Sequence, residues 1–74
     1  MGFNMYKQIN NIVKVLEEDG YKKNIPKSVF CKKLMVLYGM KKGTAITWLN
    51  NFLTVGYVSI DDKDNINFVK SEFK

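Results

Sequence analysis

The chain has 74 residues, of which 46% are hydrophobic and ten are aromatic, and its formal net charge is +5. A chain of this length can bury one modest core, which excludes a catalytic cleft between two large substructures. Its apolar content is too high for a disordered chain, and it has neither a long apolar run nor the pattern of a secretory signal. We therefore expect one compact domain over residues 1–74 in the cytoplasm, with a frayed tail at residues 70–74.

The positive charge is concentrated in the middle of the sequence. Residues 1–19 and 61–74 each carry a small net negative charge, whereas the segment between them contains no Asp or Glu. Its seven lysines are Lys22, Lys23, Lys27, Lys32, Lys33, Lys41 and Lys42. Such a basic block is typical of proteins that bind a polyanion. The sequence has no arginine, which excludes bidentate guanidinium contacts with guanine or phosphate.

The chain lacks the residues that most catalytic sites need. It has no histidine, and Cys31 is its one cysteine, which excludes an internal disulfide and is compatible with a reducing compartment. The carboxylates of Asp61, Asp62 and Asp64 lack the glycine and terminal glutamate of a calcium loop. We expect neither an enzyme nor a metal or cofactor site.

The first predicted element is an amphipathic helix from Asn4 to Asp19. Asn4 is a suitable N-cap, and Gly20 follows the last residue of the apolar pattern, where a glycine can end a helix. The apolar residues at helical spacing are Met5, Ile9, Ile12, Val13 and Leu16.

Residues 21–26 form a connector with a possible short extended piece, because Ile25 precedes a proline. A second helix then begins near Ser28, which we expect to cap it, and ends at Gly39. Its apolar stripe contains Phe30, Cys31, Leu34, Met35, Leu37 and Tyr38, and Cys31 is expected to have a packing role.

A tight connection leads to a third helix, which we expect to be capped by Thr44 and to end at Gly56. Its broad apolar side is predicted to contain Ala45, Ile46, Trp48, Leu49, Phe52, Leu53 and Val55. The remaining arc is polar but uncharged, and consists of Thr44, Thr47, Asn50, Asn51 and Thr54.

Two runs rich in β-branched and aromatic residues, 57–60 and 66–69, flank the turn-forming sequence DDKDN and predict a β-hairpin. Strand alternation predicts that one face of the hairpin packs on the core, through Val58, Ile60, Ile66 and Phe68.

The predicted order of elements is helix, helix, tight turn, helix and β-hairpin. This order resembles a winged helix-turn-helix domain, and the resemblance is carried by the sequences SVFCKKLMVLYG, MKKG, TAITWLNNFLTVG and YVSIDDKDNINFV. The resemblance implies a small α+β fold in which three helices precede a hairpin wing. It also implies a DNA-binding protein whose third helix enters the major groove of double-stranded DNA. The uncharged arc of that helix suits base edges, because Asn pairs with adenine and a Thr methyl packs on thymine.

On this hypothesis the lysines contact phosphates. Lys41 and Lys42 lie before the third helix, where free backbone N–H groups favour anions. The expected DNA-binding residues are Lys27, Lys32, Lys33, Lys41, Lys42, Lys63, Thr44, Thr47, Asn50, Asn51 and Thr54. The turn of the hairpin departs from the pattern, because its net negative charge would be repelled by phosphate. It then either stays away from DNA, with Lys63 alone reaching in, or contacts a basic protein.

Several alternatives stay open on the sequence. A DNA-binding protein of this kind could regulate transcription or be an accessory factor of a phage or other mobile element. It could form a homodimer through the first helix or the tail around Phe73. Trp48 is expected in the core, but with Tyr57 or Tyr38 it could stack on single-stranded DNA of a replication system. A protein-interaction module is the remaining possibility.

Overall fold

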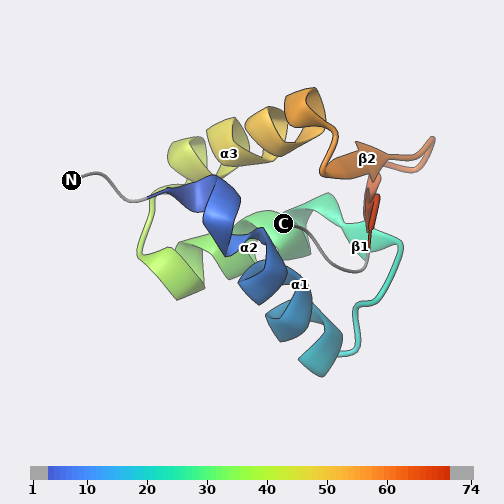
Figure 1. Ribbon diagram of the computed structural model, residues 1–74, viewed down its shortest axis with the longest axis horizontal. Coiled ribbons are helices and arrows are strands. Elements are labelled where there is room, and N and C mark those ends of the chain that lie inside the picture. The colour runs from blue at the N-terminus through green and yellow to red at the C-terminus, as the bar shows by residue number, and fades with distance from the viewer. Residues whose placement is uncertain (1–3, 71–74) are drawn as a thin grey trace.

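The computed structural model describes residues 4–70 and shows an α+β fold with three α-helices, as expected (Figure 1). The helices are α1 (Ile9–Glu18), α2 (Lys27–Tyr38) and α3 (Lys42–Val55), and a 3₁₀ turn, η1 (Met5–Gln8), precedes α1. The strands are β1 (Ile25–Pro26), β2 (Val58–Ile60) and β3 (Asn65–Phe68). None of the helices in residues 4–70 is long and apolar enough to cross a membrane.

The sheet is antiparallel and has the strand order β1-β3-β2. The predicted hairpin forms with Ile60 opposite Ile66, and the extended piece before Pro26 adds a third strand because Ile25 also pairs with Ile66. Asn67 strengthens this junction, since its side-chain oxygen accepts a 2.7 Å hydrogen bond from the backbone N–H of Asn24. The segment between α1 and α2 is therefore fixed to the hairpin.

The core lies between the helices and one face of the sheet. All five apolar residues predicted for the first helix are buried, as are Phe30 and Leu34 of α2 and Phe52 of α3. No polar or charged side chain in residues 4–70 is buried. Because the apolar face of α1 is covered by the rest of the chain, it is not available to a second copy. The other surface suggested for dimerisation, around Phe73, lies outside the described residues.

An aromatic cluster joins the elements around Phe52. The ring of Phe52 lies 6.4 Å from Phe30 of α2, 6.0 Å from Tyr6 of η1 and 6.1 Å from Tyr57 before β2, measured between centroids. Trp48 meets Tyr6 edge-on at 5.3 Å. Aromatic pairs at these separations contribute beyond the area they bury. The sequence pattern did not single out Tyr6, because its ring packs against Trp48, Phe52 and Tyr57, which are distant in sequence.

The helix ends are partly as expected. Asn4 caps η1 by accepting a 3.0 Å hydrogen bond from the N–H of Tyr6, and α2 and α3 end at Gly39 and Gly56, whose φ angles are 65° and 83°. Glycine adopts this left-handed conformation without a steric penalty.

The predicted caps Ser28 and Thr44 are wrong. Helix α2 begins at Lys27 after Pro26, and α3 begins at Lys42 after Lys41, with no side-chain cap in either case. A cap position needs a backbone outside the helical region, and Pro26 and Lys41 supply it with ψ angles of 137° and 161°. Ser28 and Thr44 are therefore already inside their helices.

Three apolar side chains expected on the core side are exposed instead. Ile60 is 40% exposed, Ile46 36% and Val55 48%. Ile60 lies on the edge strand β2, whereas its partner Ile66 lies on the central strand β3 and is covered on both sides. On α3, a narrow stripe is buried at the spacing i, i+4, i+7, formed by Ala45, Leu49 and Phe52. Ile46 and Val55 flank this stripe on opposite sides.

The pair Ile60 and Ile66 tests this account of the hairpin. Replacing Ile66, which is fully buried, with Val should lower the free energy of unfolding by about 1 kcal/mol, because a methylene is lost from a packed core. The matched change Ile60→Val should alter it by less than about 0.5 kcal/mol. Urea denaturation measures both values, and equal losses would contradict the burial pattern.

Candidate functional site

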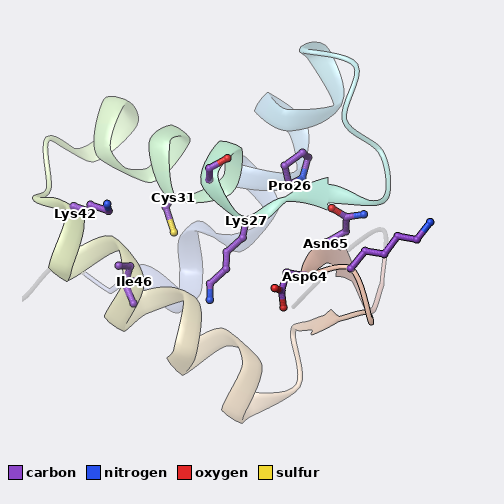
Figure 2. Close-up of a pocket in the computed structure, with 9 residues that line it drawn as sticks. Pro26, Lys27, Cys31, Lys42, Ile46, Asp64 and Asn65 are labelled. Carbon is purple, nitrogen blue, oxygen red and sulfur yellow. The ribbon is translucent and has the colours of Figure 1, made fainter.

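A groove of about 440 Å³ lies between α2, α3 and the turn of the hairpin (Figure 2). Three lysines line it, each from a different element: Lys27 from α2, Lys42 from α3 and Lys63 from the turn. Pro26, Cys31 and Ile46 supply an apolar surface between them. These residues are far apart in the sequence and meet only in the folded chain.

The groove has an order along its length. Figure 2 shows Lys42 at one end and Asp64 with Asn65 at the other, while the side chain of Lys27 extends between α2 and α3 from the middle. Lys42 and Ile46 lie on the same side of α3 because residues four apart share a helix face. The groove is therefore cationic at the end of Lys42, has an apolar wall in the middle beside Lys27, and combines Lys63 with the hydrogen-bonding side chains of Asp64 and Asn65 at the hairpin end.

The starts of α2 and α3 add to the positive potential. Neither helix has a side-chain cap or an acidic residue in its first turn, and the first residue of each is an exposed lysine. The first backbone N–H groups of a helix have no partner within the helix and carry a partial positive charge. An anion near Lys27 or Lys42 would thus meet N–H dipoles as well as ammonium groups.

The outer face of α3 carries the predicted uncharged side chains. Thr44, Thr47, Asn50 and Thr54 are exposed, and Asn51 is partly buried. The hydroxyls of Thr47 and Thr54 donate to the carbonyl oxygens of Gly43 and Asn50 at 3.0 and 2.9 Å. Since each hydroxyl proton is used inside the helix, the methyl group and the oxygen lone pairs remain for a partner.

Asp61 holds the conformation of the acidic turn through hydrogen bonds to its backbone. Its Oδ1 accepts hydrogen bonds from the backbone N–H groups of Lys63 and Asn65, both at 2.9 Å. Asp64 has a φ of 61°, which Asp and Asn tolerate better than most residues. Asp61 thus shapes the turn, whereas Asp64 lines the groove.

Lys32 and Lys33 lie apart from this groove. They line a second depression, of about 230 Å³, with Tyr21 and Val36 among its other residues, and Lys33 forms an ion pair with Asp19. At about 100° per residue, Lys32 is about 140° around α2 from Lys27. Of the predicted phosphate contacts, Lys27, Lys42 and Lys63 come together, and Lys41 adjoins them at the cap of α3.

Trp48 packs against the core through Tyr6 and Phe52, as predicted. It lies two residues from Ile46 and therefore about 160° away around α3. A stacking surface around Trp48 would thus be on the side of α3 away from the groove.

Cys31 is 8% exposed and lies in the wall of the groove. Burial raises the pKa of its thiol above the usual value, although the nearby ammonium groups of Lys27 and Lys42 act in the opposite direction. The thiol is therefore neutral at pH 7 and acts as a small apolar side chain, which agrees with the predicted packing role. In residues 4–70, no group of three metal-ligating side chains could hold an ion.

Comparisons with known proteins found no matching family model, curated protein or solved structure.

Sequence reasoning found the lysines but missed most of the groove. Ile46 was assigned to the core, and Asp64 and Asn65 were interpreted as residues of an acidic turn that either stays away from DNA or contacts a basic protein. The spacing of Lys42 and Ile46 could have indicated a shared face, but no local signal indicates that the hairpin turn approaches α2.

Two substitutions at Asp61 test its role in the turn. Asp61→Ala removes two accepted hydrogen bonds and should lower the free energy of unfolding by about 1–2 kcal/mol. Asp61→Asn removes the same charge but keeps an oxygen that accepts both bonds, so it should cost much less. Thermal or urea unfolding gives the difference; equal effects would show that charge, not hydrogen bonding, is the contribution of Asp61.

Proposed function

We propose that the protein binds double-stranded DNA as a winged-helix protein, with α3 in the major groove. The observation that carries this proposal is the convergence of Lys27, Lys42 and Lys63 beside the uncharged outer face of α3. Phosphate contacts supply most of the affinity of such a complex, and polar side chains on the helix read the bases.

The arrangement of charge supports this assignment. An exposed helix face that only faces solvent usually carries Lys and Glu, whereas α3 exposes Thr47, Asn50 and Thr54. A charge-free face flanked by ammonium groups and by a free helix start suits a surface with hydrogen-bonding edges between two phosphate strands. In this role the protein would be a transcriptional regulator or a mobile-element accessory factor.

Within the acidic turn, Lys63 is the residue that would contact DNA. Two backbone N–H groups already offset the charge of Asp61, and Lys63 beside it is exposed and reaches the groove. A phosphate strand that follows α3 would meet Lys42 and Lys27 before it meets the turn (Figure 2).

The lysines of the groove provide the first test. The double variant Lys27→Gln/Lys42→Gln should weaken binding to a labelled duplex and reduce the steepness of log K against log [salt] by about 2, because about 0.9 counterions are released per phosphate contact. Fluorescence anisotropy at several salt concentrations measures both quantities.

Lys22→Gln/Lys23→Gln is the matched control, because it removes the same charge from the loop between α1 and β1, away from α3 (Figure 1). Equal losses in the two double variants would contradict the proposed surface. No salt-dependent binding of the unchanged protein to duplex would contradict the function and favour a protein-interaction module. A preference for an unpaired strand of equal length would favour the single-strand alternative.

Asn50 tests whether α3 reads bases. Asn50 is exposed and Asn51 partly buried, so Asn50→Ala should reduce the preference for the best site selected from a random duplex pool by about 1–3 kcal/mol. Its affinity for unrelated duplexes should stay nearly unchanged. A uniform loss on all sequences would mean that Asn50 contacts only the backbone.

A further inference from the structure

Phosphate contact does not account for the whole groove. Lysines and helix starts would suffice to hold a backbone, yet the groove also has an apolar wall of Pro26, Cys31 and Ile46. Beyond that wall it ends at a carboxylate and an amide, Asp64 and Asn65, with Lys63 next to them in the turn. The carboxylate of Asp64 offsets the charge of Lys63, so this end attracts phosphate less than the end at Lys42 and suits a different part of a ligand.

The three zones match the three parts of a nucleotide. The end at Lys42 suits a phosphate, with Lys27 extending across the middle of the groove from α2 toward α3 (Figure 2). The apolar wall suits a sugar and the face of a base, and the end at Asp64 and Asn65 suits a base edge. The volume of about 440 Å³ lies within the roughly 300–1,000 Å³ of small-ligand pockets. We propose that the groove is a binding site for one unstacked nucleotide.

The chemistry of the hairpin end selects among bases. An ionised carboxylate only accepts hydrogen bonds, so Asp64 needs a base that presents N–H groups. Guanine presents an imino and an amino group side by side, and thymine presents only a single imino group. The site therefore prefers guanine to thymine, and Asn65 supplies one more donor and acceptor at the same end.

The nucleotide site gives Asp64 and Asn65 of the acidic turn a role in binding, which the proposed duplex binding does not. It requires neither paired DNA nor α3 in a major groove, so it goes beyond the proposed function. A free nucleotide and an unpaired nucleotide within a DNA strand have the same chemistry, and both would fit. The two sources are separated by experiment.

The first experiment titrates the whole ¹⁵N-labelled protein with dGMP and, separately, with dTMP. Amide signals of Lys27, Ile46 and Asn65 should shift on addition of dGMP, with signals around Val36 and Trp48 unchanged. The dissociation constant should be about tenfold lower for dGMP than for dTMP. Shifts centred on Trp48 or Val36, or no shifts at millimolar dGMP, would overturn the proposal.

Matched variants assign the effect to the groove. Asp64→Asn should abolish the preference for dGMP, and Ile46→Ala should weaken both nucleotides. Val55→Ala, a comparable exposed position on another side of α3, should change neither. Lys27→Gln should raise the dissociation constant about tenfold, and Lys32→Gln should not. Retention of the dGMP preference in Asp64→Asn would overturn the assigned orientation. A preserved ¹⁵N spectrum confirms that each variant is folded.

The second experiment compares a fully paired duplex with the same duplex carrying one bulged dG or one bulged dT. If the site takes a nucleotide within a strand, the bulged dG duplex binds about tenfold more tightly than the paired one, and Ile46→Ala removes that gain. Binding of dGMP without this gain assigns the site to free nucleotide. Salt-sensitive binding of paired duplex without any dGMP or bulge effect overturns this inference and leaves the proposed function standing. Binding of dGMP without salt-sensitive binding of paired duplex overturns the proposed function alone.

Discussion

The packing of Phe52 against aromatic rings from the other elements is the interaction on which the structure depends. Phe30 brings α2 to α3, Tyr6 brings η1, and Tyr57 brings the start of the hairpin. A chain of this size has one core and no disulfide, so few other contacts could hold the elements in place. The position of α3 relative to the hairpin, and hence the groove, follows from this cluster.

The cluster also decides which side of α3 meets solvent. With Phe52, Leu49 and Ala45 directed to the core, the threonines and Asn50 face outward and Ile46 lies at the border, beside the groove. An exposed isoleucine next to lysines would be a small cost on a purely solvated surface. Beside a ligand Ile46 supplies apolar contact area, so it belongs both to the border of the core and to the wall of the groove.

The starts of α2 and α3 show how the backbone contributes to the site. A side-chain cap would have bonded one of the free N–H groups of each helix and reduced the attraction of the helix start for anions. Pro26 and Lys41 provide the extended backbone of a cap without such a side chain. Lys27 follows Pro26, and Lys42 follows Lys41. The absence of capping side chains lowers helix stability a little and leaves two positive helix ends on a basic surface.

The sequence by itself determined the elements and the charge. Apolar periodicity set the three helices, the glycines at 39 and 56 ended two of them, and the DDKDN turn set the hairpin, because these are local properties of the backbone. The lysine-rich segment was equally visible. Local patterns were less reliable at borders, where Ile46, Val55 and Ile60 were assigned to the core, since periodicity gives the direction of a side chain but not how far neighbouring elements extend over it.

Only the tertiary structure decided which residues meet. The pairing of Ile25 with Ile66, the central place of Tyr6 and the approach of the hairpin turn to Lys27 all join segments that are distant in the chain. The same folding separated Lys32 and Lys33 from Lys42, although all of them belong to one basic segment of sequence. A linear pattern fixes the charge that a segment carries, whereas the packing of the core fixes the face on which each charge lies.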